Sequence, residues 1–162
     1  MPRQLWLLRH ADAEPHGTRE DSARRLTERG ERQARLAGKA IALMGVEFEA
    51  LLSSPKERAL RTATVAAQAW GERRGAKVEV HAPLAGGFDA RQALDALADI
   101  GTEGRLLVVG HEPDLSNVVG ELTGARIDLK KGGLVVVRLD GASGELVAIL
   151  RPHELALIAA GG

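Results

Sequence analysis

The sequence predicts a single α/β domain, a three-layer α/β/α sandwich in which helices cover both faces of a mostly parallel sheet with an antiparallel edge. Apolar, often β-branched runs alternate with segments of helical length, and this alternation is typical of parallel sheets. Two more apolar runs near the C-terminus are separated only by a short glycine-containing segment, which indicates an antiparallel hairpin. The length of 162 residues is that of one domain, so residues 1–162 are assigned to a single domain.

Six apolar runs are the expected strands of this sheet. They are residues 4–8 (QLWLL), 49–54 (EALLSS), 77–84 (KVEVHAPL), 105–110 (RLLVVG), 132–139 (GGLVVVRL) and 145–150 (ELVAIL). The segment DGASG, residues 140–144, joins the last two runs and contains the two glycines that suit a hairpin.

Helices are expected between these strands and after the last one. Their ranges are residues 27–44, 54–70, 90–100, 114–122 and 151–162. Thr27 can cap the first of them, because its hydroxyl can accept from a backbone N–H of the opening turn. Ser54 and Glu57 have the spacing of a capping box, with Pro55 at the first helical position, and this pattern predicts where the second helix begins.

Composition excludes several classes of function. Twenty-two Lys and Arg balance 22 Asp and Glu, so no net charge attracts nucleic acid or an anionic membrane, and aromatic residues, at 2%, leave almost no surface for stacking bases. The chain has no Cys, which removes disulfides and thiolate chemistry and is compatible with a reducing cytoplasm. No signal-peptide pattern and no run of ~18 apolar residues is found. We therefore expect a soluble cytoplasmic protein that binds neither nucleic acid nor membrane.

Polar residues follow two of the predicted parallel strands. Arg9 and His10 come directly after the first strand, and His111 follows the run at 105–110. Ligands of open α/β sheets bind beyond the carboxyl ends of the strands, and neighbouring strands are only ~4.8 Å apart, so a facing pair of imidazoles is reasonable. Arg58 lies one turn into a helix whose N-terminus favours an anion, and its planar fork suits phosphate. These groups together describe a pocket of phosphate size.

Such a pocket suits phosphoryl transfer. That reaction needs a positioned nucleophile and fixed donors to the phosphoryl oxygens, and a neutral imidazole, with a reference pKa of ~6.5, can be the nucleophile near pH 7. Which ring nitrogen attacks depends on the hydrogen bond that the other nitrogen makes. Taken singly, each of these histidines is more often a structural residue, and Arg58 more often a solvated helix residue.

A metal site is the other reading of these residues. The candidate ligands are His10, Asp12, His16, His111, Glu112 and Asp114. Their spacings match no compact ligand motif, and Arg9 would repel a cation. We therefore expect no metal and no cofactor, and we interpret His81 and His153 as structural.

Three stretches resemble a known family in their order and spacing. RHADAE (9–14), SSPKERALRTA (53–63) and VVGHEP (108–113) resemble the signatures of the histidine phosphatase superfamily, which has the phosphoglycerate mutase-like fold. The short length and the stretches SARRLTERGERQA (22–34) and DLKKGGLVVVRL (128–139) are similar to SixA-type phosphohistidine phosphatases. The resemblance covers nearly the whole chain.

The resemblance implies a role for each residue of the pocket. His10 would be the nucleophile that becomes transiently phosphorylated, Arg9 and Arg58 would bind the phosphoryl oxygens, and His111 would donate a hydrogen bond to them. Arg24, in the stretch that matches Arg-x-Leu-Thr, would be a further phosphate-side or substrate-side contact, and a solvated loop charge is the equal alternative for it.

One departure from the family bears on the substrate. Many phosphomonoesterases of the superfamily carry a Glu or Asp soon after the third strand to protonate the leaving alkoxide, and this chain has PLAGGFDA (83–90) there. Positioned acid catalysis is worth ~10²- to 10⁴-fold, whereas the imidazole of a labile P–N bond needs it less. Asp89 is a possible proton donor, as are Glu14 and Glu112, but the favoured interpretation of each is a surface carboxylate or, for Asp89, a helix N-cap.

The expected function is metal-independent removal of phosphoryl groups from protein phosphohistidine through a phosphohistidine enzyme intermediate. The partner would be a histidine-containing phosphotransfer domain or a phosphocarrier protein, in signal transduction, and the short loops would leave the site shallow and open. A small-molecule phosphomonoesterase that uses Asp89 as its acid, and a non-catalytic phosphate-binding module, remain as alternatives. The oligomeric state is left open, with a monomer as the working expectation.

Overall fold

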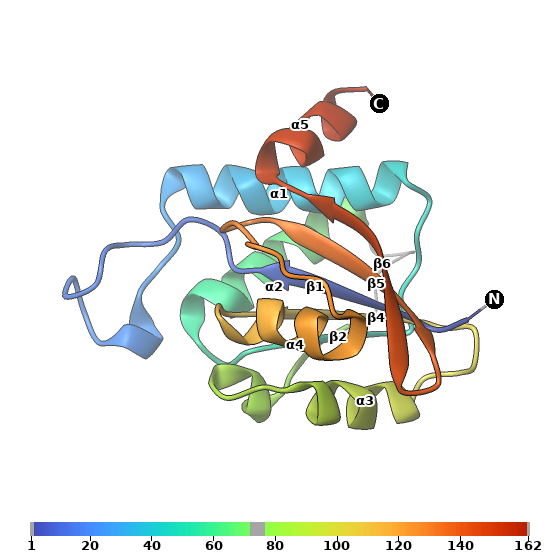
Figure 1. The fold of residues 1–162 in the computed structure, drawn as a ribbon. Helices are drawn as coiled ribbons and strands as arrows, with labels where there is room; N and C mark the ends of the chain where they lie inside the picture. Colours follow the sequence, from blue (N-terminus) through green and yellow to red (C-terminus); the bar gives the residue numbers. More distant parts are fainter. Residues whose placement is uncertain (1, 72–76, 162) are drawn as a thin grey trace.

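The computed structural model describes residues 2–71 and 77–161, so the last residue of the expected C-terminal helix, 162, lies outside the described residues. Its sheet has six strands in the order β3-β2-β4-β1-β5-β6 (Figure 1). The strands are β1 (Gln4–Arg9), β2 (Ala50–Ser53), β3 (Val78–Val80), β4 (Arg105–Gly110), β5 (Leu134–Asp140) and β6 (Ser143–Leu150). The first four are parallel, and β5 and β6 are antiparallel. The mostly parallel sheet with an antiparallel edge is thus confirmed.

Helices cover both faces of this sheet, as predicted (Figure 1). The helices are α1 (Glu28–Leu43), α2 (Glu57–Trp70), α3 (Ala90–Ala98), α4 (Asp114–Thr123) and α5 (Pro152–Ala160), with the short 3₁₀ helices η1 (Asp21–Ala23) and η2 (Ala82–Ala85). Side chains of α1, α2 and α5 pack on one face of the sheet, and those of α3 and α4 pack on the other.

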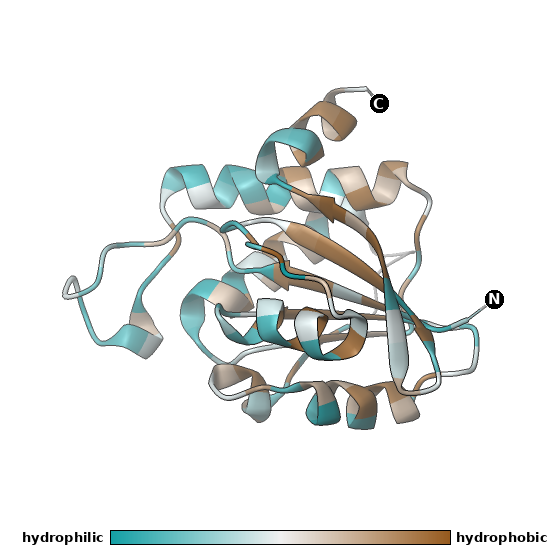
Figure 2. Cartoon of the chain, viewed as in Figure 1, coloured by the Kyte–Doolittle hydropathy of each residue, from teal (hydrophilic) through white to brown (hydrophobic). Residues whose placement is uncertain are grey.

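The central strands are apolar throughout because both of their faces are buried. In β1, Leu5 and Leu7 belong to the core beneath α3 and α4, whereas Trp6 and Leu8 belong to the core beneath α1, α2 and α5. Side chains alternate along a strand, so one run of four apolar residues supplies both cores. Figure 2 shows the same division, with apolar strands inside and polar outer faces on the helices. Burying each such side chain contributes roughly 1.5–3 kcal/mol.

Two glycines let α1 approach its neighbours closely. A Cβ at Gly38 would lie 2.2 Å from the carbonyl oxygen of Ala66 in α2. A Cβ at Gly30 would lie 2.0 Å from the carbonyl oxygen of Asp12, in the loop that follows β1. Any larger residue at either position would clash with backbone, so α1 packs directly against both α2 and the loop that carries the site.

Helix starts show which local predictions hold. Thr27 accepts a hydrogen bond from the Gly30 N–H at 3.1 Å, and Asp89 forms a capping box at the start of α3, so both expected caps are confirmed. The capping box predicted at Ser54 and Glu57 is wrong: α2 begins at Glu57 after Lys56, with no side-chain cap. The Ser54 hydroxyl contacts a histidine of the site instead.

The predicted strand at 77–84 is only partly confirmed. Pairing ends at Val80, and residues 82–85 form η2. Pro83 falls in that turn and lacks the N–H that a sheet ladder needs. In the described parts of the chain, no helix is long and apolar enough to cross a membrane.

Candidate active site

The two histidines of the site meet because β1 and β4 are adjacent and in register. Arg9 is paired with Gly110, so His10 and His111 are the next residues beyond the same edge of the sheet. Their ring centroids lie 5.3 Å apart with the planes inclined at 50°, and the side chains are largely buried. The predicted facing pair of imidazoles is confirmed.

The hydrogen bond of the His10 ring identifies the nitrogen that can react. Nδ1 lies 2.8 Å from the carbonyl oxygen of Ala11. A carbonyl can only accept, so Nδ1 carries the proton and Nε2 keeps its lone pair. The Ala11 carbonyl is itself held in place, because the Ala11 N–H donates to the Thr62 hydroxyl of α2 at 3.0 Å. The loop therefore presents His10 with Nε2 as the nucleophilic atom.

His111 is oriented by Ser54 from the neighbouring strand end. Its Nε2 lies 2.8 Å from the Ser54 hydroxyl, which also accepts from the Lys56 N–H at 3.1 Å. The Ser54 hydroxyl can donate its proton to Nε2 while it accepts from Lys56, and in this arrangement the proton of the neutral His111 ring is on Nδ1. Nδ1 is buried and has no hydrogen-bond partner among the described residues. His111 Nδ1 is therefore available to donate a hydrogen bond to a ligand bound beside His10.

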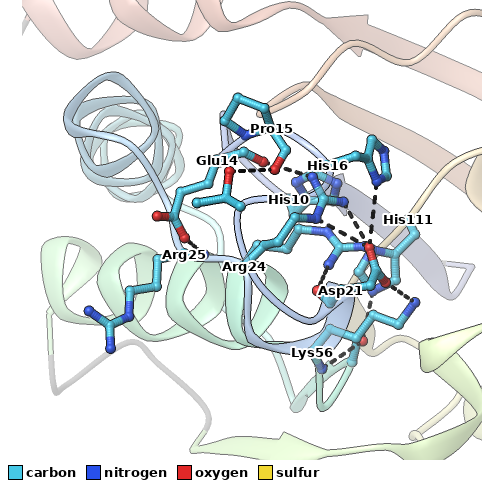
Figure 3. Close-up of polar contacts among 12 residues, drawn as sticks. His10, Glu14, Pro15, His16, Asp21, Arg24, Arg25, Lys56 and His111 are labelled. Carbon is cyan, nitrogen blue, oxygen red and sulfur yellow. Dashed lines mark hydrogen bonds and ion pairs between the residues drawn. The ribbon is translucent and has the colours of Figure 1, made fainter.

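The carboxylate of Asp21, in η1, binds three cationic side chains of the site (Figure 3). It accepts from Arg24 Nη2 at 3.0 Å, from Lys56 Nζ at 3.0 Å and from Arg58 Nη2 at 3.4 Å. These cations hold the pKa of the Asp21 carboxyl well below its usual range, with the Lys56 hydrogen bond the largest cause. Asp21 was not predicted from the sequence, because its three-residue spacing from Arg24 gives no sign that Lys56 and Arg58 converge on it.

The structure decides between the two readings of Arg24. Its side chain is buried, at 6% exposed, and its Nη1 donates to the Glu14 carbonyl at 2.8 Å, so it is not a solvated loop charge. The side chain of Arg25 turns away from the cluster (Figure 3). That Arg24 contacts substrate stays a prediction.

Arg9 and Arg58 each have a guanidinium nitrogen that no described residue accepts from. Arg9 Nη1 donates to the Leu129 carbonyl at 2.9 Å, and Arg58 Nη1 donates to the Asp21 carbonyl at 2.7 Å. The Nε of each is buried without a hydrogen-bond partner among the described residues. Buried donors of this kind are costly unless a ligand satisfies them, and an oxyanion would do so.

These side chains surround a cavity of about 200 Å³, here called the catalytic cavity. It is lined by Arg9, His10, Ala13, Glu14, Pro15, His16, Arg24, Arg58, His111, Glu112 and Lys131. The four predicted catalytic residues and Arg24 are thus brought together, whereas Asp89 is not among the lining residues. Lys131 is a further lining residue that the sequence analysis did not single out.

Both imidazoles are neutral at pH 7. Burial lowers the pKa of His10 to about 4, and the charges of Arg58, Arg9 and Lys131 add to the effect against the opposing Ala11 hydrogen bond. Burial likewise lowers the pKa of His111 to about 3, with His10, Arg58 and Lys56 acting in the same direction. The cations that would bind a phosphoryl group therefore also keep the nucleophile unprotonated.

The carboxylates considered as proton donors accept hydrogen bonds from neighbouring residues. Glu14 accepts from the Arg25 N–H at 2.7 Å and pairs with Arg19, and these contacts lower its pKa. Glu112 accepts from the backbone N–H and the hydroxyl of Ser116 at the start of α4. Asp89 accepts from the Gln92 N–H in its capping box. The structure therefore assigns Asp89 to helix capping, away from the catalytic cavity.

Asp12 and Asp114 lie outside the lining of the catalytic cavity, whereas the other four candidate metal ligands, His10, His16, His111 and Glu112, line it. Asp12 accepts from the Thr27 hydroxyl at 2.7 Å, and Asp114 accepts from the Gly87 N–H at 2.9 Å. Among residues 2–71 and 77–161, no group of three or more His, Cys, Asp or Glu side chains is arranged to hold a metal ion. The positive groups of the catalytic cavity suit an anion.

A model of the histidine phosphatase superfamily (branch 1) matches residues 5–85, half of the chain. The chain belongs to the histidine phosphatase superfamily. The matched residues include Arg9, His10, Arg24 and Arg58, while His111 joins them through the pairing of β1 with β4. As a member of this superfamily, the protein is a phosphatase with the phosphoglycerate mutase-like fold.

Solved structures extend the likeness over the whole domain. The protein histidine phosphatase SixA complexed with tungstate is 27% identical, with a TM-score of 0.83, over 94% of this chain and 99% of the other. A SixA structure from Nakamurella multipartitia is 25% identical, with a TM-score of 0.76, over 93% of this chain and 96% of the other. A phosphoserine phosphatase from Entamoeba histolytica, 16% identical over 94% of this chain and 99% of that one, shares the fold with a TM-score of 0.75.

A sequence relative is also of nearly the same length. It is an uncharacterized protein of Picosynechococcus sp. (strain ATCC 27264 / PCC 7002 / PR-6), 29% identical over 150 residues. The matched region covers 86% of this chain and 87% of the relative.

Proposed function

We propose that this superfamily member is a phosphohistidine phosphatase that removes phosphoryl groups from histidine side chains of other proteins. The observation that carries the proposal is that no free acid lines the catalytic cavity among the residues that the structure describes. Its two lining carboxylates, Glu14 and Glu112, are both engaged by neighbouring donors. An alkoxide leaving group needs a proton donor, whereas an imidazole leaving group does not need one from the enzyme.

The proposed reaction has two displacement steps. In the first, the lone pair of His10 Nε2 attacks the phosphorus atom, a new P–N bond forms, and the P–N bond of the substrate breaks. The distal nitrogen of the substrate ring can take a proton from water, so the ring leaves as neutral imidazole. In the second, water attacks the phosphorus atom and the P–N bond to His10 Nε2 breaks. The electron pair of that bond returns to Nε2, which regenerates the neutral ring, and the protons of the water leave with inorganic phosphate.

The remaining residues stabilise charge on the transferred group. Arg9, Arg24 and Arg58 supply guanidinium donors, and His111 supplies the unpartnered Nδ1. Fixed donors of this type act on the equatorial oxygens, where the charge lies during phosphoryl transfer. The guanidinium charges take the place that a metal ion has in other phosphoryl-transfer sites, so we propose a metal-independent reaction.

The likeness to SixA supports this substrate class. The SixA structure at 27% identity is described as a protein histidine phosphatase and holds tungstate, a tetrahedral oxyanion of similar shape to phosphate. We propose that the physiological partner is a phosphotransfer domain or a phosphocarrier protein, which places the enzyme in signal transduction. Pro15 and His16, at the rim of the cavity, are exposed, so a histidine on the surface of another protein can reach it.

Phosphate release measured side by side on a phosphohistidine peptide and on several phosphate esters, with EDTA present, tests the proposal. We expect a kcat/KM at least tenfold higher on the P–N substrate and no effect of EDTA. Asp89→Asn is the matched variant: because Asp89 lies outside the catalytic cavity, both activities should be unchanged. A preference for esters, with a loss of ester hydrolysis in Asp89→Asn, would support the phosphomonoesterase alternative instead.

A further inference from the structure

We infer that a basic cleft beside the catalytic cavity binds carboxylate side chains that flank the phosphorylated histidine of the substrate protein. This inference rests on the proposed function and adds a specificity determinant to it. The basic cleft is the space of about 480 Å³ lined by Arg9, Asp12, Arg29, Gln33, Lys130, Lys131, Arg151, Pro152 and His153.

The cleft is continuous with the reaction site. Arg9 and Lys131 line both the basic cleft and the catalytic cavity. Lys131 is also near enough to His10 for its charge to lower the pKa of that ring. The other walls come from the first turns of α1, the segment before β5 and the start of α5. A segment of a protein bound with its phosphohistidine at His10 would therefore have its neighbouring residues over the cleft.

The charge of the cleft is unlike that of the whole chain. Across the sequence, Lys and Arg equal Asp and Glu in number, but five cationic side chains line the cleft against one carboxylate, Asp12. Two of the five pair with carboxylates outside the lining, Lys130 with Asp128 and Arg151 with Glu154.

Two cations of the cleft are free to bind a partner. The side chains of Arg29 and Lys131 make neither a hydrogen bond nor an ion pair with any residue in the described parts of the chain. Unpaired cations gathered next to a phosphoryl site favour a substrate that carries negative charge beyond its phosphoryl group.

The exposure of these cations favours carboxylates on a protein over a second phosphate on a small molecule. Arg29, Lys130, Lys131 and Arg151 are all exposed, whereas Arg24 and Arg58 of the catalytic cavity are buried. Flexible, solvated cations steer a charged surface into place and bind it loosely, whereas tight binding of a small phosphate requires buried, fixed donors. The cleft therefore fits an acidic stretch of a substrate protein.

Two phosphohistidine peptides of equal length test the inference, one with Asp and Glu around the phosphohistidine and the other with Asn and Gln. The variant is Arg29→Gln with Arg151→Gln, since both side chains line the basic cleft and not the catalytic cavity. We expect its kcat/KM on the acidic peptide to fall about 3- to 10-fold and to become less sensitive to salt, while kcat/KM on the neutral peptide is unchanged.

Arg91→Gln with Arg138→Gln is the matched control. It also removes one exposed arginine, Arg91, that has no ion pair with a described residue, and one, Arg138, that pairs with Glu145 on the surface. It should leave kcat/KM on both peptides unchanged. Equal loss on both peptides, or no loss on the acidic one, would overturn the inference while leaving the proposed function intact. If neither peptide is dephosphorylated by the unaltered enzyme, the proposed function itself fails.

Discussion

Lowering the pH from 7 to 4 should destabilise this protein through its site histidines. Burial and the nearby charges of Arg58, Arg9 and Lys131 lower the pKa of His10 from 6.5 to about 4 in the folded chain. The ring is exposed to water in the unfolded chain and titrates near 6.5 there. Between pH 6.5 and 4, the unfolded state therefore binds a proton that the folded state does not, and stability falls as the pH falls.

The size of this effect follows from the two pKa values. Each tenfold difference in proton affinity corresponds to about 1.4 kcal/mol, so the change from 6.5 to about 4 predicts that His10 removes about 3 kcal/mol from the free energy of unfolding by pH 4. About 2 kcal/mol of that is already lost at pH 5. Asp21 adds little in this range, because its lowered pKa makes its contribution disappear only at more acidic pH.

Two measurements check the prediction, both in buffers without phosphate or sulfate, since a bound dianion would raise the pKa of the rings. Urea unfolding at several pH values gives the slope of stability for the unaltered protein and for His10→Gln. NMR titration of the ring carbons, with His10→Gln used to assign the signal, gives the pKa directly. At pH 5 a ring with a pKa of about 4 is ~90% neutral, against ~3% for an unperturbed one.

The His10→Gln variant should lose a large part of the slope between pH 7 and 4, with the remainder due to His111 and the other titrating groups. A His10 signal that titrates near 6.5 would refute the reasoning. So would a variant whose stability falls as steeply as that of the unaltered protein. Either result would mean that His10 is accessible to water and that the surrounding cations do not keep the nucleophile neutral.

Three substitutions test the other parts of the site. His10→Ala should abolish both turnover and the acid-labile phosphoenzyme, as measured with a ³²P-labelled substrate. The control His81→Ala, outside the catalytic cavity, should retain both. If the His10→Ala enzyme still became labelled, His10 would not be the nucleophile. Ser54→Ala removes the hydrogen-bond partner of His111 Nε2 and should lower kcat about tenfold. When Ser54→Ala is introduced into His111→Asn, kcat should fall little further, because the ring that Ser54 orients is already absent. Additive losses in kcat would show that Ser54 does not act through the ring. Asp21→Asn leaves buried Arg24 and Arg58 without their carboxylate and should cost about 1–2 kcal/mol in urea unfolding, while the surface change Asp95→Asn should cost nearly nothing.

Much of the fold could be predicted from local sequence patterns, and the two predictions that failed did so for different reasons. The run at 105–110 is apolar because both of its faces are buried, and it is a strand over the same residues in the structure. The run at 77–84 alternates polar and apolar residues as a half-buried strand does, but Pro83 and the edge position of β3 limit the pairing to three residues. The Ser54–Glu57 pattern failed for a different reason, because the Ser54 hydroxyl is used by His111, 57 residues away.

Some features of the site could likewise be predicted from the sequence, and others could not. The positions of His10 and His111 followed from the strand ends, because the carboxyl ends of neighbouring parallel strands lie at one edge of a sheet. The convergence of Arg24, Lys56 and Arg58 on Asp21 could not be foreseen, since it depends on where the loop after β1 places η1 against α2. The choice between Arg24 and Arg25 likewise required the direction of each side chain.

The order of hydrophobic runs and turn residues was sufficient to specify an α/β sheet with two histidines and an arginine at its edge, because strand and helix periodicity and the polarity of strand ends are properties of short segments. The folded chain alone settled which nitrogen of His10 is free, how far the pKa of each ring is lowered and which carboxylates are engaged. Those properties depend on burial, on distances of a few ångströms and on the charges of groups that are remote in the sequence. They exist only once the loop after β1, the start of α2 and the end of β4 are packed together.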